Sequence, residues 1–270
     1  MGEQLLQKFL PYLDNVEWSG EPAANAQGRQ AYIVGLDKVE ASGGEPKALA
    51  EAIRVFQSGD SLPYAYAGVA YILLAASEER DGSYAPLGLE AAMGWLEKAQ
   101  ALEPDIVDIN VIEAFVYVYN GRYDDALLVI DFLYGLEPMN YHVHLATVAF
   151  WEAQKDLPQI ELAIAEAAKA AATLPQKFRL TNRLGDLYMQ FDELDKALAA
   201  YKENAHFDPK NPLLWHKISL VYWRLDDLDE AERANQQSLR LGALPAAQKM
   251  AEQLKERKKQ ETGRFGGLFK

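Results

Sequence analysis

The sequence TNRLGDLYMQFDELDKALAAYKENAHFDP runs from Thr181 to Pro209. Its pattern of residue types recurs 34 residues later, in the stretch that begins at Trp215. In both stretches a small residue, Gly185 or Ser219, stands four positions after the first residue, and a tyrosine follows three positions later. An alanine comes nine residues after each tyrosine. A period of this length is typical of chains built from stacked supersecondary units. The repeat therefore predicts tandem helical hairpins.

The same pattern extends toward the N-terminus. One block begins at Asn110, and another begins at His144 and runs three residues long before the next block starts. The four blocks together cover residues 107–242. A weaker copy begins at Tyr64 and carries an insertion at residues 78–88, and residues 27–56 are predicted to form one more helical hairpin. The sequence therefore predicts about six hairpins.

These blocks resemble the tetratricopeptide repeat, whose pattern is W-x2-L-G-x2-Y, then A-x3-F, then P over 34 residues. The resemblance implies an all-α, right-handed superhelical solenoid over residues 23–244, in which each hairpin buries its apolar face only by stacking on its neighbours. Before the solenoid, residues 1–22 are predicted to be an amphipathic helix, broken at or just before Pro11, and a linker. After it, residues 245–270 are predicted to be a capping helix through Lys259 and a flexible basic tail at 263–270.

The composition excludes several kinds of chemistry. Among 270 residues, 40 acidic residues against 27 Lys and Arg give a net charge of -13, which argues against a broad nucleic-acid surface. Nearly all of the excess acid lies in residues 1–140. The chain has no cysteine, so thiol chemistry and disulfides are excluded. The sequence has no apolar run of membrane-spanning length and no basic start followed by an apolar run, so it predicts a cytoplasmic protein without a transmembrane segment.

Two short motifs could suggest an enzyme. Gly59-Asp60-Ser61-Leu62 spells the signature of the GDSL hydrolases, but no aspartate stands three residues before any histidine to complete that family's Asp-x-x-His pair. A serine esterase using Ser61 is therefore only a remote alternative. His142 and His144 are two residues apart and point to opposite sides of a helix, so they do not form a metal site. The sequence predicts a protein that is not an enzyme and needs no cofactor or metal.

In this family the first helix of each hairpin lines a concave groove. The groove positions of the N-terminal half are apolar, and those of the C-terminal half are basic with interleaved aromatic residues. The apolar set is Tyr66, Val69, Ile72, Val111, Ile112, Phe115 and Tyr119. The basic set is Arg179, Asn182, Arg183, His216, Lys217, Trp223 and Arg224. An apolar groove needs a cover, which could be the chain's own helix at residues 5–13 or the helix or extended segment of a partner.

The resemblance also bears on the partner. Some members of this family bind a partner's C-terminus through a carboxylate clamp, a set of five polar or basic side chains. Arg179 and Arg183 match two basic positions of this clamp. Its other three positions are occupied by the apolar residues Val111, Phe115 and Ala146. A looser site for an acidic segment remains possible, because guanidinium groups pair well with carboxylates. The resemblance thus implies a non-catalytic scaffold or adaptor that binds a partner peptide or helix in its groove. The alternative is a structural assembly factor whose groove is self-occluded and whose partners dock on the convex face or the C-terminal tail.

Overall fold

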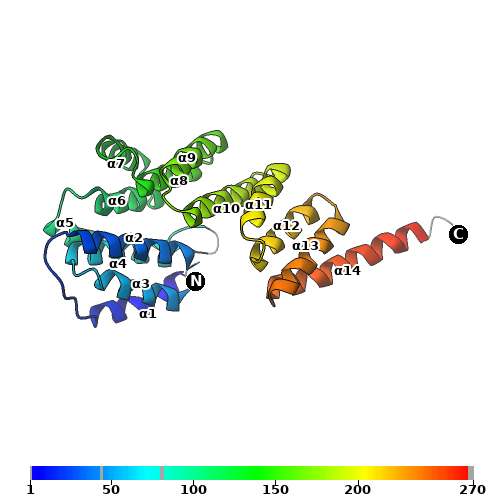
Figure 1. The fold of residues 1–270 in the computed structure, drawn as a ribbon, viewed down its shortest axis with the longest axis horizontal. Coiled ribbons are helices and arrows are strands. Elements are labelled where there is room, and N and C mark those ends of the chain that lie inside the picture. The colour runs from blue at the N-terminus through cyan, green and yellow to red at the C-terminus, as the bar shows by residue number, and fades with distance from the viewer. Residues whose placement is uncertain (1, 43–44, 80–81, 267–270) are drawn as a thin grey trace. The chain divides into compact units, whose positions relative to one another are not determined.

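The computed structural model describes residues 2–42, 45–79 and 82–266 (Figure 1). Fourteen α-helices and no β-strand form in this part of the chain, so the predicted all-α fold is confirmed. The helices are α1 (Gly2–Asp14), α2 (Ala26–Ala41), α3 (Pro46–Gln57), α4 (Leu62–Ser77), α5 (Pro86–Leu102), α6 (Val107–Tyr119), α7 (Tyr123–Leu136), α8 (Tyr141–Gln154), α9 (Leu157–Ala170), α10 (Leu174–Gln190), α11 (Leu194–Phe207), α12 (Pro212–Arg224), α13 (Leu228–Leu241) and α14 (Pro245–Gly266).

The chain divides into two compact units. Unit 1 comprises Met1–Ala170 with helices α1 to α9, and unit 2 comprises Ala171–Lys270 with α10 to α14. The block that begins at His144 is three residues longer than the repeat, and these residues precede Thr181. They lengthen α10, which has 17 residues, whereas the equivalent helix α12 has 13. The expectation of a single solenoid over residues 23–244 stays a prediction.

In unit 1 the hairpins α2/α3, α4/α5, α6/α7 and α8/α9 follow one another along the chain. Two glycines allow the hairpin α2/α3 to pack closely. The Phe56 ring of α3 lies against Gly35 of α2 and Gly68 of α4, where an added Cβ would come within 2.1 Å and 2.4 Å of ring atoms. The small residue that the repeat pattern places at Gly68 therefore makes room for an aromatic ring of the preceding hairpin.

The insertion after α4 contacts another hairpin of unit 1. Backbone pairing closes its turn, with Glu79 N–H donating to the Ser83 carbonyl at 2.8 Å. Tyr84 then stacks on Tyr119 of α6, with ring centroids 3.7 Å apart. The insertion thus reaches the next hairpin along the chain.

The predicted N-terminal helix forms, but the expected break at Pro11 is wrong. Helix α1 continues through Pro11 to Asp14. A proline inside a helix removes one backbone hydrogen bond, and burial of Leu6 and Leu13 on the same helix offsets this loss. Helix α1 packs on α4 and α5, where Leu6 lies against Gly88.

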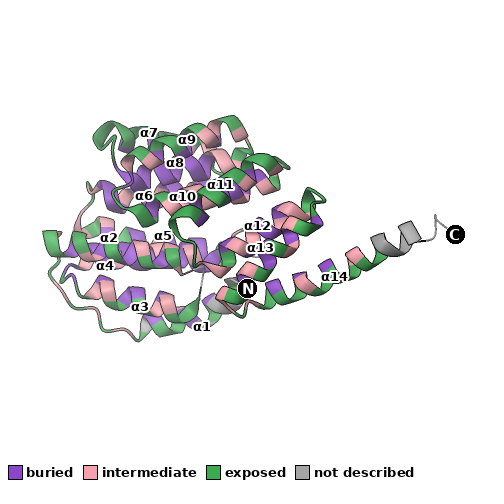
Figure 2. Cartoon of the chain, turned by 45° about the vertical axis from the view of Figure 1, so that its right-hand side comes forward, coloured by how far each residue is buried: buried purple, intermediate pink, exposed green. Residues whose placement is uncertain are grey.

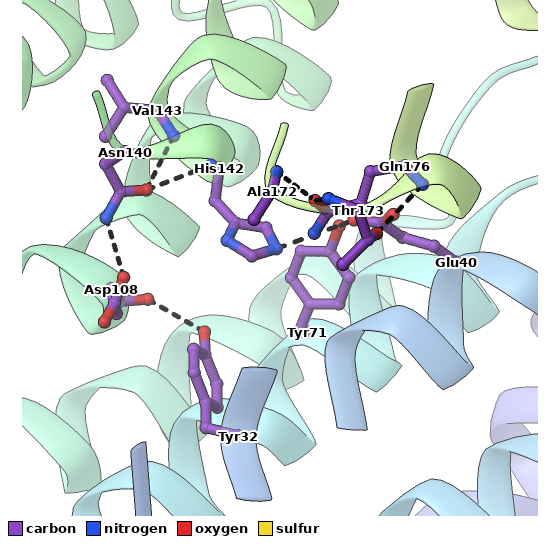
Figure 3. Close-up of polar contacts among 10 residues, drawn as sticks. All are labelled: Tyr32, Glu40, Tyr71, Asp108, Asn140, His142, Val143, Ala172, Thr173 and Gln176. Carbon is purple, nitrogen blue, oxygen red and sulfur yellow. Dashed lines mark hydrogen bonds and ion pairs between the residues drawn. The ribbon is translucent and has the colours of Figure 1, made fainter. Parts of the chain in front are cut away.

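Unit 2 contains the hairpins α10/α11 and α12/α13, and α14 packs on α13. Helix α10 begins with a capping box, in which Thr173 Oγ1 accepts from Gln176 N–H and Gln176 Oε1 accepts from Thr173 N–H (Figure 3). At the other end, α14 buries Ala247, Met250 and Leu254, as expected of a capping helix. It continues to Gly266, beyond its predicted end at Lys259, and residues 267–270 of the predicted tail lie outside the described residues.

Candidate partner-binding surfaces

The apolar groove residues of unit 1 are largely buried. Val69, Ile72, Val111, Ile112 and Phe115 have at most 4% of their surface exposed. The two remaining members of the set are partly exposed and contact other aromatic rings. Tyr66 contacts Trp18 and Trp95, and Tyr119 stacks on Tyr84. None of the seven is a fully exposed side chain.

Helix α2 contacts the first helices of the third and fourth hairpins through the buried Asp108 of α6 (Figure 3). Arg29 Nε of α2 lies 2.7 Å from Asp108 Oδ2, and the Tyr32 hydroxyl donates to the Asp108 carbonyl at 2.9 Å. From the N-terminus of α8, Asn140 Nδ2 donates to Asp108 Oδ1 at 2.7 Å. Burial and the nearby Asp108 carboxylate raise the pKa of Tyr32 well above its usual value. Asp108 thus joins α2, α6 and α8.

A second contact joins α2 to α8. Glu40 Oε1 near the end of α2 lies 3.7 Å from His142 Nε2, and it accepts a hydrogen bond from the Tyr71 hydroxyl of α4 at 3.4 Å. The Tyr71 ring meets His142 and Phe115 edge to face. Burial, with Glu40 nearby, raises the pKa of Tyr71 well above its usual value. The first helices of unit 1 therefore contact one another where the sequence predicted an apolar groove covered by the helix at residues 5–13 or by a partner.

In unit 2, three members of the basic set are held by neighbouring side chains. Lys217 Nζ lies 2.7 Å from Asp186 Oδ1 and donates to Asn182 Oδ1 at 3.2 Å. Arg224 Nη2 lies 2.6 Å from Asp192 Oδ1. These contacts join α12 to α10 and to the turn that follows it. They fix Lys217 in place while leaving it partly exposed.

The other members of the basic set differ in exposure. His216 is buried, and this burial lowers its pKa, so the ring is neutral near pH 7. Trp223 is partly exposed beneath the Arg257 guanidinium of α14, whose carbon lies 4.6 Å from the ring centroid. Arg179 and Arg183 are partly exposed and lie one turn apart on α10.

Two ion pairs of unit 2 follow the repeat period. Arg224 pairs with Asp192, and Arg257 pairs with Asp226 in the same way one repeat later. Both aspartates have a positive φ, 63° and 64°, in the turn between the two helices of their hairpin. In both cases the base follows the turn aspartate by 31 or 32 residues. Arg257 of α14 thus corresponds to Arg224 of α12, so α14 occupies the position of the first helix of a further hairpin.

Ser61 has a structural position. It is the residue before α4, its side chain is 1% exposed, and its Oγ donates to the Ala23 carbonyl at 2.9 Å. A nucleophilic serine needs a base that accepts its proton, and here a backbone carbonyl occupies that direction. Among the described residues no group of three or more His, Asp or Glu could hold a metal ion.

We expect the Ser61→Ala variant to lower the free energy of unfolding by about 1 kcal/mol, because it leaves the Ala23 carbonyl without its donor. Hydrolysis of p-nitrophenyl acetate should stay unchanged. Ser58→Ala, which removes an exposed hydroxyl, is the matched control for chemical denaturation. A loss of turnover in Ser61→Ala alone would instead identify a nucleophile.

Comparison with known proteins identifies the fold. No family model matches the chain. A structure described as a functional characterization of Pseudomonas aeruginosa pilF matches at a TM-score of 0.55 and 17% identity, over 77% of this chain and 89% of that one. MamA from Desulfovibrio magneticus RS-1 matches at a TM-score of 0.47 and 19% identity, over 66% of this chain and 94% of that one. A thermophilic TPR protein of Thermus thermophilus matches at a TM-score of 0.45 and 18% identity, over 63% of this chain and 90% of that one.

One curated sequence also matches. The general transcriptional corepressor ssn6 of Schizosaccharomyces pombe is 35% identical over 69 residues, which are 25% of this chain and 6% of that protein. With the repeat signature and the stacked hairpins, the similarity to the pilF structure shows that the chain has a tetratricopeptide repeat fold. In the part of the chain that the structure describes, no helix combines the length and the hydropathy required to span a bilayer.

Proposed function

We propose that the chain is a non-catalytic scaffold that binds an acidic segment of a partner protein on the α10/α12 face of unit 2. The observation that carries this proposal is a set of three partly exposed cations, Arg179 and Arg183 on α10 and Lys217 on α12, two helices that the Lys217 contacts to Asn182 and Asp186 bring together. Lys217 is already ordered by Asp186 and Asn182, so binding would immobilise one flexible side chain fewer. Arginine guanidinium groups can take carboxylates bidentately.

The test is a binding titration with a fluorescein-labelled peptide of twelve glutamates. We expect the Arg179→Glu/Arg183→Glu variant to bind about tenfold more weakly than the unmodified chain, because it removes two charge-assisted contacts and adds repulsion. Fluorescence anisotropy at about 50 and 150 mM salt measures both chains, and the difference should shrink at the higher salt.

The matched control is Lys210→Glu/Arg240→Glu, which changes the charge of unit 2 equally at two positions away from this face. If this variant weakens the peptide as much as Arg179→Glu/Arg183→Glu does, the attraction comes from net charge alone. The proposed face would then have no specific role.

A second candidate function is an assembly factor whose partners dock away from the groove. The burial of the apolar groove residues in unit 1, together with the α2 contacts to Asp108 and His142, favours this candidate. Its partners would then need another exposed apolar surface.

A further inference from the structure

Helix α7 of unit 1 carries apolar side chains on both of its faces. Its inner face buries Ala126, Ile130 and Leu133, as the repeat pattern requires. Its outer face exposes Leu128 and Phe132, which are 70% and 64% exposed. In Figure 2 exposed residues predominate along the outer side of α7. The outer apolar residues are not explained by the stacking of the hairpins.

These exposed side chains are concentrated in one place. Six of the fourteen exposed large apolar residues described in the structure lie within residues 127–139. Leu128, Phe132 and Leu136 follow at intervals of four and form one ridge along the helix. Gly135 lies beside this ridge, and an added Cβ there would meet no atom within 4 Å. Contiguous exposed apolar surface of this kind is typical of interaction sites.

The charge around the ridge is negative. Asp124 and Asp131 lie on the same side of α7 as the ridge. Arg122 is the only Lys or Arg between Lys98 and Lys155, and it is already paired with Asp125 at 2.8 Å. A partner that buries the ridge would thus approach acidic side chains on a helix that itself contains no Lys or Arg.

We propose that the outer face of α7 is a docking site for an amphipathic helix of another protein, whose large apolar side chains are flanked by Lys and Arg. The apolar ridge supplies contact area for the partner's apolar side chains, and Asp124 and Asp131 attract the flanking cations. A second copy of this chain fits less well, because two α7 faces would bring their aspartates together. This site is distinct from the α10/α12 face, so the two proposals can fail separately.

The test uses an 18-residue helical peptide of leucine and lysine, with leucines at i, i+3, i+4 and i+7, and a twin in which glutamate replaces lysine. Isothermal titration calorimetry with the full chain in about 150 mM salt should show micromolar binding of the lysine peptide. We expect Leu128→Ser/Phe132→Ser to weaken binding at least about tenfold, and Asp124→Asn/Asp131→Asn to weaken it about threefold. The glutamate twin should bind at least about tenfold more weakly.

Two control variants separate the site from general effects. Leu174→Ser/Leu213→Ser removes two exposed apolar residues elsewhere, and Glu90→Gln/Glu97→Gln removes two exposed charges of α5. Both should bind the lysine peptide normally, and so should Arg179→Glu/Arg183→Glu. An unchanged melting temperature of Leu128→Ser/Phe132→Ser will show that its fold is intact.

Three results would overturn the proposal. The first is no binding of the lysine peptide to the unmodified chain, and the second is equal binding by Leu128→Ser/Phe132→Ser. The third is a concentration-dependent dimer in sedimentation that Leu128→Ser/Phe132→Ser abolishes, which would assign the α7 face to a second copy.

Discussion

Replacing Met250 and Leu254 together by alanine should lower the free energy of unfolding of unit 2 by about 4 kcal/mol, since each buried large-to-alanine change typically costs about 2 to 5 kcal/mol and neighbouring changes are not additive. The two side chains are 3% and 2% exposed and pack with Leu228 and Ala231 of α13. They cover the apolar face that α13 presents to α14.

Polar contacts of α14 should be lost along with this packing. Asn235 donates to the Ala247 carbonyl, and Arg257 and Lys258 pair with Asp226 and Asp229. The ion pairs are exposed and contribute little by themselves. We therefore expect α14 to detach as one element when its apolar residues are removed.

Hydrogen exchange followed by mass spectrometry can locate the effect. Protection should fall in α12, α13 and α14 and stay unchanged in α4 to α8 of unit 1. The control variant Lys249→Ala/Gln253→Ala changes two exposed positions of the same helix and should leave protection unchanged. Equal protection in the Met250→Ala/Leu254→Ala variant and the unmodified chain would show that α14 does not stabilise unit 2.

The repeat signature predicted those parts of the fold that depend on neighbours in the chain. A small residue at Gly68 or Gly185 is required because a ring, Phe56 or Tyr201, occupies the space that a side chain would fill. Such contacts join one helix to the next or to its hairpin partner, and therefore they recur with the period. The order of hairpins and the capping helix follow from the same rule.

The contacts between distant hairpins could not be predicted in this way. Arg29 is 79 residues from Asp108, and Glu40 is 102 residues from His142. Whether such side chains meet depends on how tightly successive hairpins wind, and a small rotation per repeat accumulates over three repeats. The sequence therefore predicted apolar residues at the first-helix positions of unit 1, and their role as groove positions stays a prediction. It did not predict that α2 contacts α6 and α8.

In unit 2 the residue types were recognised but their partners were not. Lys217 and Arg224 were predicted to be groove cations, and the structure pairs them with Asp186 and Asp192. A charge pattern along one chain does not distinguish a cation that awaits a partner from one that is already paired. The recurrence of Arg257 opposite Asp226 is the feature that would have made the distinction.

Gly68→Ala should lower the free energy of unfolding of unit 1 by about 2 kcal/mol, although glycine to alanine inside a helix usually stabilises by up to about 1 kcal/mol. The added Cβ would lie 2.4 Å from Cγ of Phe56, and that ring is 1% exposed and is also confined by Gly35. It cannot move away without displacing α2 or α4. Urea denaturation followed by far-UV circular dichroism measures the change.

The sign of the effect distinguishes crowding from helix propensity. Gly94→Ala in α5 is the control, because a Cβ there meets no atom within 4 Å, and it should raise stability. Phe56→Leu should lower the free energy of unfolding by itself, but combined with Gly68→Ala it should relieve the clash. The loss in the double variant should therefore be smaller than the sum of the two single losses by at least about 1 kcal/mol. If the two losses simply add, Gly68 and Phe56 are not coupled and the close approach of α4 to α3 has another cause.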